Sequence, residues 1–139
     1  MNYYNEIKTE LLNNEVYKKV KDYSKNKSDL MTYYNVGKLL VEAQGGTSKE
    51  RNRYGNTLIK RYSQKLSTEL GKGYSWRNLY NMRSYYLLLE ENKILQAMTA
   101  KLTWSHFCEL LVLKDINKIL YYIKISDEQN ISYRKYMKK

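Results

Sequence analysis

The chain has 139 residues, no proline, one cysteine and a formal charge of +11, because 25 Lys and Arg side chains stand against 14 Asp and Glu. One cysteine excludes an intramolecular disulfide and suits a reducing compartment. The start of the chain does not resemble a signal peptide, and no apolar stretch approaches the ~20 residues of a membrane span, so we expect neither export nor membrane insertion. We therefore expect a soluble cytoplasmic domain that forms its own core.

The N-terminal third has helical periodicity. Residues 5–24 place apolar side chains at helical spacing, with charged residues between them: Ile7, Leu11, Leu12, Val16 and Val20. A turn and cap at residues 26–29 should precede a second helix over residues 30–43. Its apolar positions are Met31, Tyr34, Leu39 and Val41, and its glycine, Gly37, would let another backbone approach closely. Residues 44–50, which include adjacent glycines, predict a loop.

Two further helices with a glycine turn between them are predicted in the centre of the chain. The third helix covers residues 53–70 and carries one apolar face, formed by Leu58, Ile59, Tyr62, Leu66 and Leu70. It should end at the Gly71-Lys72-Gly73 segment, because glycine adopts the left-handed conformation that terminates helices. Ser75 is the expected N-cap of a fourth helix over residues 76–90. The inward positions of that helix are Leu79, Met82, Tyr86 and Leu89.

Shorter helices are expected in the C-terminal part. They cover residues 92–100, a segment from a cap at Thr103 or Ser105 through Leu113, residues 115–125, and a final start at Ser132. No segment alternates with the period of a strand. The predicted fold class is all-α: one compact multi-helix domain over residues 1–139. It contains N-terminal helices in 1–43, a helix-turn-helix unit in 53–91 and C-terminal helices in 92–139.

The positive charge is concentrated rather than scattered. Residues 49–83 hold nine basic and two acidic side chains, a net charge of +7, and the last seven residues add +4. The remainder of the chain is close to neutral. A localised positive field attracts a polyanion, and the release of its counterions would supply most of the affinity. The charge pattern therefore favours nucleic acid, with duplex DNA first, as the partner.

A helix-turn-helix unit presents the start of its second helix to base edges in the major groove. The candidates for base contact are Ser75, Trp76, Arg77, Asn78, Tyr80 and Asn81. Arg suits guanine and Asn suits adenine, whereas a Trp directly after a cap, such as Trp76, is more often a packing anchor than a base contact. The candidates for contact with the phosphate backbone are Lys60, Arg61, Lys65, Lys72 and Arg83.

Residue types that carry out catalysis or bind metals are sparse. His106 is the only histidine, which excludes a His-based metal cluster. Its neighbour Ser105 cannot act with it as a catalytic pair, because adjacent helical residues point in different directions. We expect a structural histidine, no metal, no cofactor and no catalytic residues.

Several motifs occur in an order that resembles one family. They are Tyr33-Tyr-Asn-Val-Gly-Lys38, Arg53-Tyr-Gly55, Leu66-Ser-x-x-Leu70 and, most distinctive, Gly73-Tyr-Ser-Trp-Arg-Asn-Leu-Tyr-Asn-Met-Arg83. From about Tyr33 onward they resemble the N-terminal domain of the YhcG-type family of bacterial proteins, with Tyr34 where the family often has Trp and Thr103 where it often has Pro. The resemblance implies a helical domain with a winged-helix-like or helix-turn-helix-like role in DNA binding.

The resemblance also implies an association with defence or mobile-element systems. In the family this domain usually precedes a PD-(D/E)XK nuclease domain, whose paired carboxylates and lysine have no counterpart in these residues, so we do not expect an enzyme. The leading hypothesis is a DNA-binding module, acting as a dimer and with a nuclease or effector protein as its partner. The alternative is a protein–protein interaction or oligomerisation module, such as an inhibitor or a subunit of a larger effector. Mimicry of DNA is excluded, because it needs acidic charge.

Overall fold

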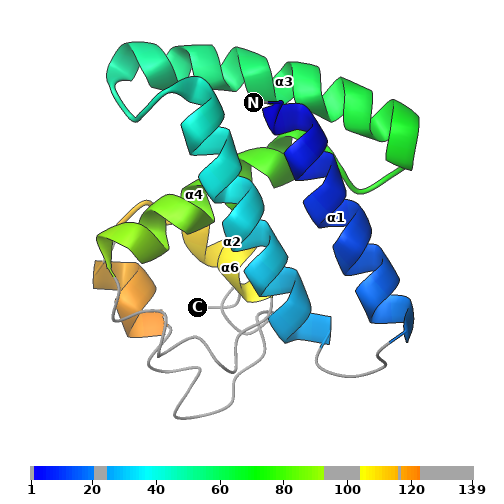
Figure 1. Cartoon of the computed structure of the whole chain (residues 1–139). Helices are drawn as coiled ribbons and strands as arrows, with labels where there is room; N and C mark the ends of the chain where they lie inside the picture. Colours follow the sequence, from blue (N-terminus) through cyan, green and yellow to red (C-terminus); the bar gives the residue numbers. More distant parts are fainter. Residues whose placement is uncertain (1, 21–24, 93–103, 116, 123–139) are drawn as a thin grey trace. The chain divides into compact units, whose positions relative to one another are not determined.

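The computed structural model describes residues 2–20, 25–92, 104–115 and 117–122 (Figure 1). Its helices are α1 (Tyr3–Val20), α2 (Lys25–Gln44), α3 (Lys49–Leu70), α4 (Trp76–Glu91) and α6 (Trp104–Leu111), and residues 117–122 are also helical. No strand occurs within the described residues, and the all-α prediction is confirmed. The chain divides into two compact units, Met1–Leu87 and Leu88–Lys139.

Helix α2 starts earlier than predicted. It begins at Lys25, so the expected turn at residues 26–29 is helical and that prediction was wrong. Asp29 was expected to cap the helix, but its carboxylate accepts a hydrogen bond at 2.8 Å from the side chain of Asn14 on α1. A contact between helices thus replaces the local cap, and the weak helix propensity of Asn, Ser and Asp is overridden by tertiary packing.

Helices α1 and α2 run side by side in opposite directions (Figure 1). Ile7 and Leu11 of α1 are buried, as are Val36 and Leu40 of α2. The buried face of α2 therefore differs from the predicted apolar positions, since Met31 is 60% exposed. Burying an aliphatic side chain of this size contributes roughly 1.5–3 kcal/mol.

Gly37 lies where α2 crosses α4, and here the prediction of a close backbone approach is confirmed. A Cβ atom on this residue would overlap the backbone carbonyl oxygen of Met82 and the Cβ of Tyr86. The rings of Tyr34 and Tyr86 meet beside the crossing, with 5.0 Å between their centroids. A larger residue at position 37 would therefore separate the two helices.

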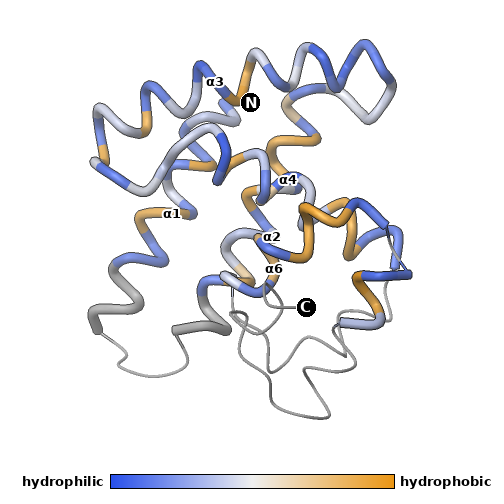
Figure 2. Tube along the Cα trace, turned by 180° about the vertical axis from the view of Figure 1, so that it is seen from behind, coloured by the Kyte–Doolittle hydropathy of each residue, from blue (hydrophilic) through white to orange (hydrophobic). Residues whose placement is uncertain are grey.

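Helix α3 begins four residues before its predicted start. Ser48 is its N-cap and accepts a hydrogen bond from the backbone N–H of Arg51 at 3.2 Å, and Glu50 adds a favourable charge to the first turn. The loop between α2 and α3 is therefore shorter than residues 44–50. Its glycines, Gly45 and Gly46, have φ angles of 88° and 118°. Figure 2 shows α3 as mostly hydrophilic, with isolated hydrophobic positions.

The predicted core face of α3 is confirmed for its central residues. Leu58, Ile59 and Leu66 are buried, and Tyr62 and Leu70 are partly buried. Near its C-terminal end α3 packs against the start of α1. The Tyr4 hydroxyl donates a hydrogen bond to Glu69 at 2.6 Å, and Lys8 forms an ion pair with the same carboxylate. These two hydrogen bonds hold the pKa of Glu69 below its usual value.

In the second unit, α6 buries His106, Phe107 and Leu110. The helix ends at Leu111, two residues before the predicted end. Asp115 then accepts a hydrogen bond from the backbone N–H of Asn117 at 2.9 Å and caps the helical residues that follow. Apart from Asn92, the helix predicted over residues 92–100 lies outside the described residues, as do the cap at Thr103 and the predictions for residues 123–139. Within the described part, no helix has the length and apolar character needed to cross a bilayer.

Candidate nucleic-acid interface

The connection between α3 and α4 is a tight glycine turn. Gly71 and Gly73 have φ angles of 96° and 107°, which a residue with a Cβ rarely adopts. The backbone N–H of Gly71 donates to the carbonyl of Ser67 at 3.1 Å and closes α3. The Ser63 hydroxyl donates to the carbonyl of Tyr74 at 2.7 Å and links the turn to the side of α3. The position of α4 beside α3 is therefore fixed by hydrogen bonds as well as by packing.

The start of α4 has the predicted cap. The Ser75 hydroxyl oxygen accepts a hydrogen bond from the backbone N–H of Asn78 at 3.1 Å. The Asn78 side chain donates to the carbonyl of Gly73 at 3.1 Å. Two of the candidate contact residues, Ser75 and Asn78, thus help to form the turn, while their neighbours Trp76 and Arg77 are exposed.

A cleft of about 160 Å³ lies between α3 and α4. It is lined by Asn56, Ile59 and Lys60 of α3 and by Trp76 and Tyr80 of α4. Trp76 is 49% exposed and Tyr80 is 39% exposed, so both side chains are partly accessible to a partner. An exposed aromatic pair beside a basic helix is typical of a surface that binds a partner.

Two cations flank the Trp76 ring. The Nζ of Lys60 lies 5.9 Å from the ring centroid, and the guanidinium carbon of Arg77 lies 6.0 Å from it. These distances are within the range of a weak cation–π attraction. Both cations stay on the surface, where a phosphate can reach them.

Arg83 is not on this surface. Its side chain is 5% exposed, and its guanidinium donates from Nη1 to Gln44 Oε1 at 2.5 Å and from Nη2 to Asn56 Oδ1 at 2.6 Å. The guanidinium carbon also lies 5.0 Å from the ring centroid of Tyr80. Burial lowers the pKa of Arg83, but an Arg pKa starts so high that the side chain remains charged at neutral pH. Arg83 therefore stabilises the cleft from the protein interior, through its contacts with Asn56 and Tyr80.

Gln44 extends the same buried network. Its side chain is fully buried and donates from Nε2 to the carbonyl of Gly46 and to Asn52 Oδ1, both at 2.7 Å. A Cβ on Gly55 would overlap the Gln44 Oε1 atom and would approach Arg83 Nη1. The network thus joins the end of α2 to α3 and α4, and a Cβ at position 55 would force the Gln44 amide or the Arg83 guanidinium to move.

The other predicted phosphate contacts separate into two groups. Lys65 lies about 140° around α3 from Lys60, since each residue advances the helix by about 100°. Its Nζ is 4.2 Å from the ring centroid of Tyr4 on α1. Arg61 and Lys72 are exposed without sharing the cleft, and Asn81 is partly buried on α4. The structure thus brings together Lys60, Trp76, Arg77 and Tyr80.

Sequence reasoning missed Asn56 and Arg53. Asn56 lines the cleft and accepts the hydrogen bond from Arg83. Arg53 is exposed and precedes Lys60 by two helical turns, so both cations lie on about the same face of α3. A signal for the first was Gly55, because a glycine inside a helix indicates a close approach of other groups.

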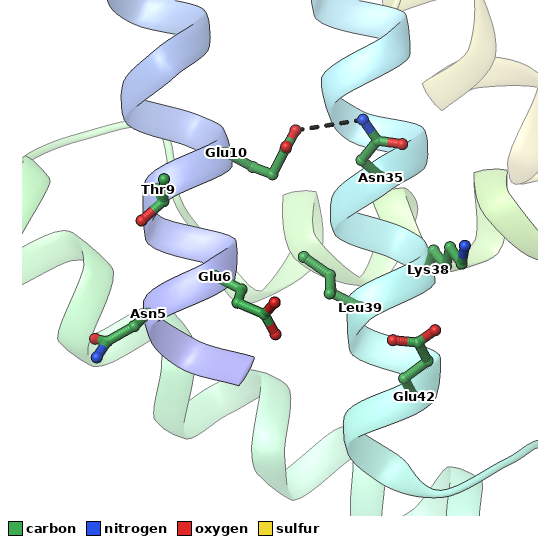
Figure 3. Close-up of a pocket in the computed structure, with 8 residues that line it drawn as sticks. All are labelled: Asn5, Glu6, Thr9, Glu10, Asn35, Lys38, Leu39 and Glu42. Carbon is green, nitrogen blue, oxygen red and sulfur yellow. Dashed lines mark hydrogen bonds between the residues drawn. The ribbon is translucent and has the colours of Figure 1, made fainter. Parts of the chain in front are cut away.

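A second hollow, of about 470 Å³, lies between α1 and α2 in the same unit (Figure 3). In Figure 3 the side chains of Glu10 and Asn35 face each other across it, and the Asn35 amide donates to Glu10 at 3.3 Å. The groove holds three glutamates and one lysine, and its full lining is Asn5, Glu6, Thr9, Glu10, Asn35, Lys38, Leu39 and Glu42. Among the described residues, no three His, Cys, Asp or Glu side chains are grouped so that they could hold a metal ion.

The comparisons with known proteins agree with the resemblance seen in the sequence. The family described as "DUF1016 N-terminal domain" matches residues 7–139. The chain is 39% identical over 72 residues to "Putative nuclease YhcG" of Escherichia coli (strain K12), a match that covers 52% of this chain and 19% of that protein. No solved structure matches the chain significantly. The predicted YhcG-type relationship is confirmed, and the chain belongs to the DUF1016 N-terminal domain family.

Proposed function

We propose that this chain is a DNA-binding module whose α3–turn–α4 segment acts as a helix-turn-helix and docks on duplex DNA. The observation that carries the proposal is the pair of exposed rings, Trp76 and Tyr80, with the cations of Lys60 and Arg77 close to the Trp76 ring. This group lies at the start of α4, where the unpaired backbone N–H groups of a helix favour negative charge. The surrounding residues 49–83 carry a net charge of +7.

In this proposal the phosphates supply affinity, and the start of α4 supplies selectivity. Lys60, Arg53 and Arg77 are exposed cations suited to the backbone, whereas Trp76 and Tyr80 are suited to base or sugar contact. A dimer would engage two half-sites on the duplex. Arg83 is outside the contact surface, because it is buried.

The similar protein from Escherichia coli is named as a putative nuclease. We propose that the chain itself directs a nuclease system of bacterial defence or of a mobile element to DNA, and that cleavage belongs to another domain or subunit. Metal-dependent nucleases hold their metal ions with grouped carboxylates. Among the described residues no three His, Cys, Asp or Glu side chains are grouped for a metal, and the lining of the cleft includes no carboxylate.

The test is a fluorescence-anisotropy titration of a labelled duplex at several salt concentrations. We expect log K to fall linearly with log salt, and Lys60→Ala or Arg77→Ala to lower the steepness of that slope by about 1. Lys38→Ala is the matched control, because Lys38 is also an exposed helical lysine but lies in the acidic groove. Absence of binding at low salt, or equal effects of Lys60→Ala and Lys38→Ala, would contradict the proposal.

The alternative, a protein-interaction or oligomerisation module, has a separate observation in its favour. Val112 and Tyr121 in the second unit and Met31 on α2 are large apolar side chains that are well exposed. A partner bound through such residues would stay bound at high salt, because apolar burial is not screened. At about 1 M salt the Debye length is only about 3 Å, so charge attraction is largely screened. A partner protein that stays bound under these conditions and is released by Val112→Ser would support this function.

A further inference from the structure

We propose that the cleft between Trp76 and Tyr80 is a pocket for one unpaired nucleobase. The module would then bind DNA that carries an unstacked base more tightly than a fully paired duplex. This inference rests on the proposed function and deepens it by naming the feature of DNA that the cleft recognises.

The size of the cleft fits a single planar ring. Its volume is about 160 Å³, and a cavity of about 150 Å³ in another protein is known to hold one benzene molecule. Two of its lining residues, Trp76 and Tyr80, are aromatic, and the buried Ile59 adds an aliphatic surface. Aromatic side chains bind bases by stacking, which every base permits because each has a π face. A duplex groove contact alone does not need such a cavity.

The cleft also contains a hydrogen-bond donor whose orientation is set. A guanidinium has only donors, so the atom of Asn56 that faces Arg83 must be its carbonyl oxygen, Oδ1. The Asn56 amide nitrogen is therefore the group left for a ligand in the cleft. It can donate to a carbonyl oxygen or ring nitrogen of a base. Gln44 accepts a hydrogen bond from Arg83, and the missing side chain of Gly55 leaves room for the guanidinium, so both residues set the position of this donor indirectly.

The charges around the cleft fit a base that remains attached to its strand. Lys60 and Arg77 lie about 6 Å from the Trp76 ring centroid, at 5.9 Å and 6.0 Å. A base stacked on that ring would have its neighbouring phosphates within reach of these flexible side chains. An apolar protein side chain would fill the cleft without using the Asn56 donor or either cation. The combination of ring, donor and cations therefore favours a nucleotide.

The experiment compares three labelled DNA probes of equal length with the full chain by fluorescence anisotropy. One is fully paired, the second carries a single bulged thymidine, and the third carries an abasic bulge that distorts the backbone in the same way. We expect the wild type to prefer the thymidine bulge by about ten-fold over both other probes, which is the size of one stacking contact. In a further probe, the bulged thymidine is replaced by the fluorescent base 2-aminopurine. Its emission should be quenched on binding, because the base would stack on an aromatic ring.

Variants test the residues that form the pocket. Trp76→Leu and Asn56→Asp should reduce the preference for the thymidine bulge to less than about two-fold, and Trp76→Phe should restore most of it, because it keeps a ring. Asn56→Asp keeps an acceptor for Arg83, and the charge that it adds weakens all three probes, so the ratio between probes is the readout. Unchanged circular dichroism and thermal unfolding show that these variants fold.

The possible outcomes separate the two proposals. If none of the probes binds at low salt, the proposed DNA-binding function is wrong. If the paired and bulged probes bind equally, DNA binding stands and the nucleobase pocket is wrong. If the abasic and thymidine bulges bind equally, the protein detects the bend rather than the base, and the pocket is again wrong. A ten-fold preference that survives Trp76→Leu and Asn56→Asp would also overturn the inference.

Discussion

The N-terminal unit has two hollows, the α1–α2 groove and the α3–α4 cleft, and their lining residues carry different charges. The larger, between α1 and α2, holds three glutamates and one lysine. The smaller, between α3 and α4, holds Lys60 beside two exposed aromatic rings and contains no carboxylate. A polyanion is repelled by the first and attracted by the second. Under the proposed function, the smaller cleft is therefore the better candidate for DNA binding, although the groove is larger and the net charge of the whole chain does not distinguish the two.

The two hollows also differ in how they are supported. Across the α1–α2 groove the Asn35 amide donates a long hydrogen bond of 3.3 Å to Glu10 (Figure 3). Behind the α3–α4 cleft, Arg83 links Gln44 and Asn56 with hydrogen bonds of 2.5 and 2.6 Å. A buried, hydrogen-bonded group of this kind favours one geometry, because losing these bonds would leave polar atoms unpaired. The cleft is therefore preformed.

Among the changes that test the support of the α3–α4 cleft, Arg83→Met should have the largest effect on the free energy of unfolding. The change removes the charge and leaves the Gln44 and Asn56 side-chain oxygens without their buried donor. We expect the free energy of unfolding to fall by about 3 kcal/mol in urea denaturation. Arg77→Met is the control on the same helix, and because Arg77 is exposed it should change stability by less than about 0.5 kcal/mol. Similar losses in both variants would show that the network does not stabilise the cleft.

Gly55→Ala should cause the next largest loss of stability. The new methyl group would overlap Gln44 Oε1 and crowd Arg83 Nη1. Overpacking of this kind costs about 2 kcal/mol, even though alanine has the higher helix propensity. Thermal unfolding measures the change, with the exposed Thr57→Ala on the same helix as the control. A stabilised Gly55→Ala variant would mean that the network has room that the structure does not show.

Opposite charge changes in the two hollows sharpen the comparison. Lys60→Glu and Glu42→Lys alter the net charge by the same amount in opposite directions. We expect Lys60→Glu to weaken DNA binding by about ten-fold, and Glu42→Lys to change it by less than about two-fold, because only the first lies in the proposed contact face. Symmetric changes in affinity would show that total charge, rather than the α3–α4 face, governs binding.

The smallest expected effect concerns pH and the contact between α1 and α3. Burial, together with the hydrogen bond to Glu69, raises the pKa of Tyr4 to about 12, and burial raises that of Tyr85 to about 12. An unfolded tyrosine titrates near 10, so the folded state holds the proton more tightly. This contribution to stability is complete below pH 10 and is lost as the pH rises from 10 to 12.

Tyr4→Phe removes one of these titrations. Its stability should be lower at pH 8, because the bond to Glu69 is lost, and should decline less steeply between pH 10 and 12 than that of the wild type. Urea denaturation at several pH values measures both. A slope equal to that of the wild type would contradict the proposed role of Tyr4.

The parts of this picture that depend on local signals were predictable from sequence. The turn at Gly71 and Gly73, the Ser75 cap and the start of α4 at Trp76 were all expected, because capping and left-handed glycine depend on neighbouring residues only. The candidate residues Lys60, Trp76, Arg77 and Tyr80 came from the same local reasoning, and the structure places them together.

The parts that depend on distant partners were not predictable. Arg83 was grouped with the surface cations, but it bonds Gln44, a residue 39 positions away, and is buried. The early start of α2 depends on Asn14 and Asp29 in the same way. A single sequence shows the residue types but not their partners, so charge alone could not distinguish a buried arginine from an exposed one.

The most direct test of the central claim is an NMR titration of the ¹⁵N-labelled chain with a short DNA duplex at low salt. Binding at the α3–α4 face should shift or broaden the amide signals of residues 56–60 and 76–80 and leave those of residues 6–10 and 35–42 unchanged. Changes concentrated in residues 6–10 and 35–42, or no change at all with excess DNA, would contradict the account.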